Sequence, residues 1–188
     1  TKHEKWLTMI KQEIIDSGLI VDILNAKTME DVFRLLQGCS FLGSFLAYQY
    51  TIDMNYSPYI NFSENDFVKA GIGAIRGIKK CFLCYGNKCE DAIWYVKEHF
   101  NDLQKRYGYT SFHPLLGHEP TLIDLQNCFC ETDKYLRAKM PELRIGNVRI
   151  KQKYMPHTDP IQFFFPPKWN IVEMYKYKPI VVPTLFDL

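Results

Sequence analysis

The sequence lacks any apolar run long enough to span a membrane, and its first residues show no signal-peptide pattern. It also lacks internal repeats and low-complexity linkers. Its net charge is only +2, so no overall positive charge indicates a nucleic-acid-binding protein, and any such signal has to be local. We therefore expect an intracellular protein with no membrane partner.

Regular cysteine spacing is also missing, although the chain has six cysteines. Cys81, Cys84 and Cys89, with Cys128 and Cys130 further on, are candidates for a zinc or iron–sulfur site. Their spacing matches neither a standard zinc ribbon nor a cluster-binding loop. Irregular spacing in a chain of this size is typical of the free thiols of an intracellular protein. The sequence therefore predicts reduced, partly buried thiols, with no metal and no cofactor.

The apolar content, by contrast, is high enough for a folded domain, since 47% of the residues are hydrophobic and 15% are aromatic. We expect one helical domain over residues 1–140, with a core of its own. Residues 141–188 begin with a basic run, which either faces phosphate or is simply solvated. They continue as an extended tail rich in proline and aromatic residues. Because residues 155–188 are too apolar to be free, we expect them to wrap the helical body or to bind a partner.

Hydrophobic periodicity and capping residues predict an all-α fold. Helices are expected over residues 2–17, 28–38, 41–53, 63–70, 73–80, 90–107 and 120–137. Thr28 and Asp31 have the pattern of a capping box, with Asp in place of the usual Glu. The helix over 41–53 is apolar nearly all round, so we expect it to be buried. Its Gln49 and Asp53 lie on one stripe, where they either make structural hydrogen bonds or contact a substrate in a cleft.

The turn Gly71-Ile-Gly73 lies between two of the expected helices, and residues 66–80 have the pattern of a helix-hairpin-helix motif. The free N–H groups at the start of the second helix suit a phosphate, and Arg76 and Lys79 follow closely. The stretch is not a Walker loop, because Gly-x4-Gly-Lys-Ser/Thr cannot be laid over it. The alternative is a plain corner between two helices.

The last expected helix, over residues 120–137, has an apolar face and a polar face. The apolar face carries Leu122, Leu125, Phe129 and Leu136. The polar face carries Asp124, Asn127, Glu131 and Lys134. Asn and Asp form helices less well than the Lys and Glu that a merely soluble face would carry, so this polar face is a candidate site. The alternative is a solvated face on which Glu131 and Lys134 form a surface pair.

Three stretches of the chain together resemble a known family. They are residues 42–57, which include Gln49 and Asp53, residues 65–82, which include the glycine turn, and residues 124–135, which begin with Asp124. In this order they are similar to a DNA-glycosylase-like helical family, the α-glutamyl/putrescinyl-thymine pyrophosphorylases. They are also similar to a related helical domain attached to 5-hydroxymethyl-deoxyuridine DNA kinases.

The resemblance implies a helix-hairpin-helix, DNA-glycosylase-like bundle that acts on a modified base in DNA. The DNA-backbone contacts that it implies are Gly71, Gly73, Arg76 and Lys79, which would hold phosphates without reading sequence. A flipped thymine-type base would lie between the helix over 41–53 and the helix over 120–137. The implied contacts to this base are Gln49, Asp53, Gln126 and Asn127.

The resemblance also implies roles for the polar face of the last helix. Asp124 takes the position of the catalytic Asp of the glycosylases. In the hypermodifying relatives an amine displaces an activated group from the thymine methyl carbon. Asp124 or Glu131 would act as general base toward that amine, and Lys134 would stabilise the departing phosphate.

We therefore expect a transferase that hypermodifies a 5-hydroxymethyluracil-derived base in DNA, displacing phosphate or pyrophosphate with an amine. The alternatives are a base-excision glycosylase for a modified pyrimidine and a non-catalytic DNA-binding or scaffold module. The expected partners are double-stranded DNA with a modified base, a small amine or amino acid, and a protein partner or an N-terminal segment docked on residues 155–188. The expected location is the cytoplasm of a phage-infected cell, or the nucleus of a eukaryotic one.

Two departures from the family pattern affect the expected site. The family usually has Gly-Pro-Gly where this chain has Gly71-Ile-Gly73, which changes the stiffness of the turn more than its shape. The relatives also carry a segment rich in Asn, Arg and Asp before the equivalent of Thr1. Because the chain begins with Thr1 and not Met, we expect a fragment or a processed product that holds part of the active centre.

Overall fold

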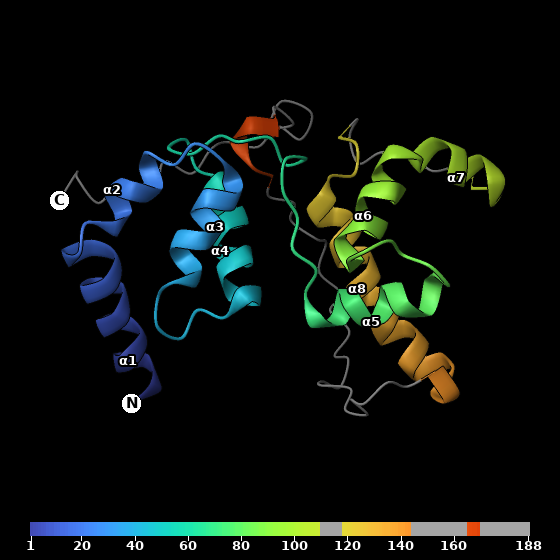
Figure 1. The fold of residues 1–188 in the computed structure, drawn as a ribbon, viewed down its shortest axis with the longest axis horizontal. Coiled ribbons are helices and arrows are strands. Elements are labelled where there is room, and N and C mark those ends of the chain that lie inside the picture. Colours follow the sequence, from blue (N-terminus) through green and yellow to red (C-terminus); the bar gives the residue numbers. More distant parts are fainter. Residues whose placement is uncertain (110–117, 144–164, 170–188) are drawn as a thin grey trace, which may run out of the picture. The chain divides into compact units, whose positions relative to one another are not determined.

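The computed structural model describes residues 1–109, 118–143 and 165–169. The chain divides into two compact units, Thr1–Pro156 and His157–Leu188. The regular elements of the described residues are all helical, apart from one isolated bridge residue at His118. The expected all-α fold is therefore confirmed (Figure 1).

The first unit is a series of short helices and one long helix, α8 (Figure 1). Its elements are α1 (Lys2–Met9), η1 (Ile10–Asp16), α2 (Leu19–Leu24), α3 (Met29–Gln37), α4 (Ser44–Asn55), α5 (Ile72–Cys81), α6 (Cys89–Glu98), α7 (Phe100–Arg106), α8 (Leu122–Lys139) and η2 (Pro141–Leu143). The helix expected over 2–17 is present, but its second half, η1, has the wider hydrogen-bonding pattern of a π-helix. Gly18 follows with a φ of +81°, which glycine adopts without steric cost.

The α3 and α4 helices pack against each other and contribute many of the core residues. The start of α3 is as predicted, because the Thr28 hydroxyl accepts from the Asp31 N–H at 3.1 Å and the Asp31 carboxylate accepts from the Thr28 N–H at 3.0 Å. The expected burial of α4 holds for one face only, since Ala47, Tyr48 and Ile52 are at most 4% exposed. Phe45 and Tyr50 of the same helix are 55% and 38% exposed, so the helix is not buried all round.

The short helix expected over residues 63–70 is absent, so that prediction is wrong. Residues 61–71 contain one turn and otherwise no regular structure, and α5 begins directly after Gly71. The first helix of the expected helix-hairpin-helix motif is therefore missing. The glycine turn begins a helix instead of joining two helices.

Side chains of the neighbouring helices explain why this segment does not need to be helical. Asn55 accepts from the Phe62 N–H at 2.8 Å and donates to the Phe62 carbonyl at 3.1 Å. Glu90 accepts from the Ala70 N–H at 3.0 Å and pairs with Lys69 at 2.9 Å. Burial alone would raise the pKa of Glu90, but these two partners lower it overall. Asn55 thus fixes the chain just before residues 63–70, and Glu90 satisfies an N–H group, that of Ala70, which a helix would have satisfied internally.

The α5 and α8 helices make the most extensive helix–helix contact of the described residues. Gly73 and Gly77 lie on the face of α5 that meets α8. A Cβ at Gly77 would lie 2.0 Å from the carbonyl oxygen of Phe129, and a Cβ at Gly73 would lie 2.5 Å from Sγ of Cys130. The two helices can therefore approach this closely only because α5 has no side chain at these positions.

A buried ion cluster joins the same two helices. Lys80 Nζ lies 2.5 Å from Asp133 Oδ1, and Arg137 Nε lies 3.1 Å from Asp133 Oδ2. The side chains of Lys80 and Asp133 are only 3% and 2% exposed. Charges at such depth are tolerated only in pairs, so the cluster ties α5 to α8.

The helix expected over residues 90–107 is divided at His99 into α6 and α7. His99 leaves the helical conformation, with a φ of −107° and a ψ of 19°. Its ring stacks on Tyr95 at 4.4 Å, and its Nδ1 lies 2.9 Å from the Tyr95 carbonyl.

Among the described helices, none combines the length and the apolar character of a membrane span.

Only residues 165–169 of the second unit are described. They contain the 3-10 turn η3 (Pro167–Trp169), and the rings of Phe165 and Trp169 lie 6.2 Å apart. The basic run after Leu143 and most of residues 155–188 lie outside the described residues. The domain boundary after residue 140, the extended tail and a partner docked on it therefore stay predictions.

Candidate functional site

Three parts of the chain meet around Gly71: helix α4, the segment 61–71 and the first turns of α8. A Cβ at Gly71 would lie 3.1 Å from a phenylalanine ring of α4 and 3.2 Å from the amide nitrogen of Gln126 on α8. Asp124 on α8 also lies close enough to two tyrosines of the α4 region to act on them electrostatically. The α4 and α8 helices thus approach each other where the sequence pattern predicts a site.

Three side-chain amides in this region have buried atoms that make no hydrogen bond within the described part of the chain. These atoms are Nε2 of Gln49 on α4, Oδ1 of Asn65 in the segment and Oε1 of Gln126 on α8. Gln126 is only 1% exposed. A buried polar atom without a partner costs about 1–3 kcal/mol, so such atoms are rare where a region serves packing alone. One buried donor and two buried acceptors therefore stay without a partner in this region.

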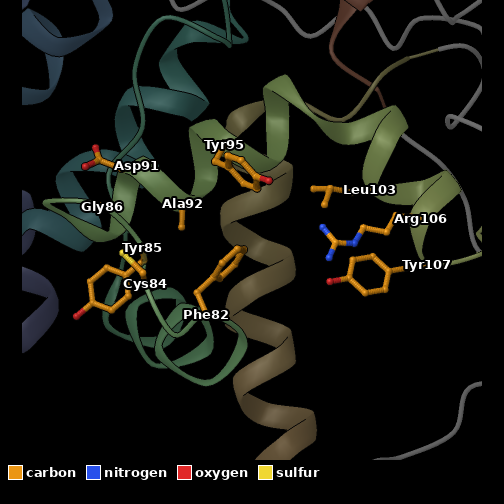
Figure 2. A pocket seen from close by; sticks show the side chains of 10 residues that line it. All are labelled: Phe82, Cys84, Tyr85, Gly86, Asp91, Ala92, Tyr95, Leu103, Arg106 and Tyr107. Atoms are coloured by element: carbon orange, nitrogen blue, oxygen red, sulfur yellow. The ribbon is translucent and has the colours of Figure 1, made fainter.

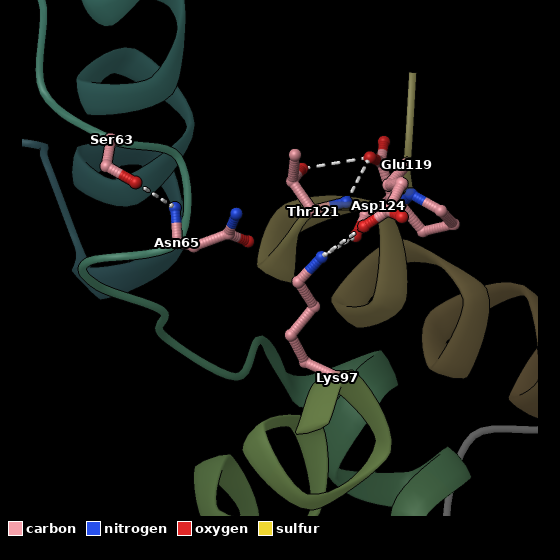
Figure 3. A network of polar contacts seen from close by, with 7 residues as sticks. Ser63, Asn65, Lys97, Glu119, Thr121 and Asp124 are labelled. Atoms are coloured by element: carbon pink, nitrogen blue, oxygen red, sulfur yellow. Dashed lines mark hydrogen bonds and ion pairs between the residues drawn. The ribbon is translucent and has the colours of Figure 1, made fainter. Parts of the chain in front are cut away.

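Asp124 caps the start of α8 (Figure 3). Its Oδ2 accepts from the Thr121 N–H at 2.8 Å and from the Thr121 hydroxyl at 2.9 Å. Figure 3 also shows the side chain of Asn65 turned toward Thr121, and Lys97 donating to the Pro120 carbonyl at 2.8 Å. Both bonds to Asp124 use the same oxygen. The carboxylate therefore has a structural role in addition to any chemical one.

Buried Tyr48 and half-buried Tyr56 lie near Asp124. Burial raises the pKa values of Tyr48 and Tyr56 well above 10.0, their ordinary value. The negative charges of Glu64 and Asp124 add to the shift, because they oppose a tyrosinate. Both hydroxyls therefore stay protonated at physiological pH, and that of Tyr48 donates to the Phe67 carbonyl at 3.5 Å.

The other predicted residues of the polar faces lie at the solvent. Asn127, Glu131 and Lys134 are exposed, and Glu131 forms an ion pair with Lys134 that raises the pKa of Lys134. Asp53 on α4 is exposed as well, and partial burial of its carboxyl raises its pKa. The polar face of α8 is thus present as predicted, but only Asp124 lies against the α4 region. Glu131 and Lys134 have the geometry of the alternative, a surface pair.

The expected phosphate contacts lie at the start of α5. Gly71 is the N-cap and Gly73 belongs to the first turn, so their environment is a helix N-terminus with unbonded N–H groups. Arg76 is half-buried and Lys79 is exposed on the same helix. Lys80 points into the buried ion pair with α8, so its charge is not available to DNA.

The sequence pattern did not reveal two of these features. Asn65 lies in the stretch expected to form a helix over residues 63–70. At the start of such a helix it would be interpreted as a capping residue and not as a site residue. Asp133 lies four residues after Phe129, on the apolar face of α8, and a carboxylate at such a position requires a buried partner. That spacing is the signal by which the ion cluster with Lys80 and Arg137 could have been found.

The structure describes all six cysteines, and each is a free thiol. Cys81, Cys84 and Cys128 are exposed, whereas Cys39 is buried. Within the described residues, no three His, Cys, Asp or Glu side chains gather in a way that could hold a metal ion.

Residues 1–145 match a family model described as the helical domain of 5-hmdU DNA kinase, where 5-hmdU is 5-hydroxymethyl-deoxyuridine. The chain belongs to this family. The resemblance to the helical domain of these kinases is thereby confirmed, and the match includes every helix from α1 to α8. No curated protein and no solved structure matches the chain.

Proposed function

We propose that this helical domain binds DNA and reads a flipped base of the 5-hydroxymethyluracil type. The observation that carries this proposal is the group of buried amides of Gln49, Asn65 and Gln126, whose unpartnered atoms come from three separate elements. The family supports the choice of base, because its name joins this domain to a kinase for 5-hmdU in DNA.

The hydrogen-bonding groups of the amides complement this base. A 5-hydroxymethyluracil presents carbonyl acceptors at O2 and O4, and donors at N3 and at its hydroxymethyl group. Nε2 of Gln49 can donate to a base carbonyl, while Oδ1 of Asn65 and Oε1 of Gln126 can accept from the two donors. Proteins that act on bases commonly read a flipped base through its Watson–Crick edge in this way.

The first turn of α5 supplies the contact to the DNA backbone in this proposal. Gly71 and Gly73 present N–H groups without intervening side chains, and Arg76 and Lys79 add positive charge on the same helix. Such contacts position the DNA and carry no sequence information. The motif Gly-x4-Gly-Lys-Ser/Thr occurs nowhere in the 188 residues, and we assign base recognition rather than phosphoryl transfer to this domain.

We expect Gln126→Leu to weaken binding to a duplex with one 5-hydroxymethyluracil by about tenfold to a hundredfold. Leucine nearly matches the volume of glutamine and removes the buried carbonyl that has no partner. The free energy of unfolding should therefore stay the same or rise. Fluorescence anisotropy with a labelled duplex at fixed salt measures the affinity, and urea denaturation measures the stability.

The matched control is Gln12→Leu, because Gln12 is exposed on η1 and distant in sequence from the amides. It should leave both quantities unchanged. A duplex with thymine at the same position measures specificity. The proposal fails if the unaltered chain binds both duplexes equally, or if Gln126→Leu binds as tightly as Gln12→Leu.

A second candidate function is base hypermodification, which the position of Asp124 in the same region favours. In this reaction an amine nitrogen forms a bond to the thymine methyl carbon, and the bond from that carbon to a phosphate or pyrophosphate oxygen breaks. The proton of the amine passes to the carboxylate of Asp124. The roles expected for Glu131 and Lys134 stay predictions, because both lie on the exposed face of α8.

We expect Asp124→Asn to reduce amine addition by about a hundredfold or more while the fold is kept. Asparagine retains an oxygen that can accept from Thr121, whereas Asp124→Ala would remove this cap and lower stability by about 1 kcal/mol. The assay is mass spectrometry of nucleosides after incubation with an amine and a duplex that contains the pyrophosphorylated base. A mass gain would establish hypermodification, release of the base would establish a glycosylase, and salt-sensitive binding without either change would leave a binding module.

A further inference from the structure

A groove of about 470 Å³ lies between the loop after α5 and the helices α6 and α7 (Figure 2). The three amide residues that we propose to read the base, Gln49, Asn65 and Gln126, are called the base-reading group below, and none of them lines the groove. Four of its lining residues are aromatic, namely Phe82, Tyr85, Tyr95 and Tyr107. Its volume falls within the range of small-molecule sites, about 300–1,000 Å³.

One cation, Arg106 at the end of α7, lines this groove. Its guanidinium lies 5.9 Å from the centre of the Tyr107 ring. Figure 2 shows the guanidinium turned toward the middle of the groove, with Phe82 and Tyr95 on the opposite side. Among the described residues no carboxylate forms an ion pair with Arg106. Its charge is therefore available to an anion.

The wall opposite α7 is fixed in place by local hydrogen bonds. Asp91 accepts from the N–H groups of Asn87 and Lys88 at 2.8 and 3.1 Å, so its carboxylate is engaged by the loop. Gly86 has a φ of +83°, and a Cβ there would lie 2.7 Å from the Asp91 carboxylate. The loop thus packs directly on Asp91, which fixes this wall of the groove.

We propose that this groove binds one nucleotide unit, a planar base with its phosphate, either free or within a single DNA strand. Aromatic side chains stack on bases of any sequence, and an arginine can hold a phosphate through two parallel hydrogen bonds. The groove offers both, with Tyr95 and Tyr107 exposed at its sides and Arg106 between them. This site goes beyond the base-reading group, because it requires no modified base.

The test uses the whole chain and two probes, thymidine 5′-monophosphate and a fluorescein-labelled oligothymidylate of about eight nucleotides. Arg106→Gln should weaken binding about tenfold. Lys105→Gln is the matched control, because Lys105 is exposed beside Arg106 but does not line the groove. It removes one positive charge as well, and should change the affinity for either probe by less than about twofold. Tyr95→Leu should weaken binding about tenfold through lost stacking, and Tyr107→Leu replaces it as the test if Tyr95→Leu does not fold.

The two probes distinguish the sources of the nucleotide. Binding of the monophosphate supports a free nucleotide, and binding of the oligothymidylate alone supports a DNA strand. Failure of both probes to bind, or equal losses in Arg106→Gln and Lys105→Gln, would overturn the proposal. If the monophosphate does not bind, loss of oligothymidylate binding in Gln126→Leu but not in Arg106→Gln would also overturn it, because the strand would then occupy the base-reading group. Neither probe contains 5-hydroxymethyluracil, so the two proposals stand or fall separately.

Discussion

Gly77→Ala should lower the free energy of unfolding by about 3 kcal/mol or more. The new Cβ would lie 2.0 Å from the carbonyl oxygen and 2.8 Å from the carbonyl carbon of Phe129. Both atoms belong to the backbone of α8, so no side-chain rotation can relieve the overlap and α5 has to move away. Urea denaturation followed by circular dichroism measures the loss.

Helix propensity alone predicts the opposite sign for this substitution. Alanine in the interior of an exposed helix is more favourable than glycine by about 1 kcal/mol, so a stabilised Gly77→Ala would show that α5 and α8 do not approach this closely. Gly43→Ala is the matched control. No atom lies within 4 Å of a Cβ at Gly43, and its φ of −69° suits alanine. Gly43 is the N-cap of α4, where alanine is less favourable than glycine. We therefore expect Gly43→Ala to lower the free energy of unfolding by less than about 1 kcal/mol.

Asp133→Asn should lower the free energy of unfolding by about 3–5 kcal/mol. Asparagine keeps the shape of the side chain but removes the charge that faces Lys80 at 2.5 Å and Arg137 at 3.1 Å. The side chain of Lys80 is 3% exposed, and its ammonium would stay buried without a counter-charge. Thermal and urea denaturation of the variant at neutral pH measure the effect.

Glu131→Gln on the same helix is the control for this prediction. The side chains of Glu131 and Lys134 are 66% and 55% exposed, so removing this ion pair should change stability by less than about 1 kcal/mol. Lys80→Met should cost less than Asp133→Asn, because Asp133 keeps its contact with Arg137. Equal and small losses for Asp133→Asn and Glu131→Gln would show that the cluster is solvated.

Local rules predict much of the helix pattern correctly. The capping box of Thr28 and Asp31 and the two faces of α8 follow from spacing alone, because a helix repeats every 3.6 residues whatever its neighbours are. The same rules fail over residues 63–70 and at His99. In the first case Glu90, 20 residues further along the chain, bonds the backbone of Ala70, and no local pattern contains that information.

The candidate site was predictable only in part. The sequence indicates Gln49 and Asp124 on two helices, and the structure brings these helices together. The sequence does not indicate that Gln126 is buried, because its burial depends on the approach of Gly71 from another part of the chain. The sequence also could not identify Asn65 as a site residue, because the position of its side chain depends on a segment without regular structure.

The sequence by itself determined the helical class, most helix boundaries and the family to which the chain belongs. Only the tertiary structure decided how the glycines of α5 are used. In the sequence Gly71 and Gly73 have the pattern of a hairpin that grips phosphate, whereas in the structure Gly73 and Gly77 make room for the backbone and side chains of α8. The pair Lys80 and Asp133 shows the physical reason, because 53 residues separate them and their meeting depends on how two helices pack rather than on any local preference.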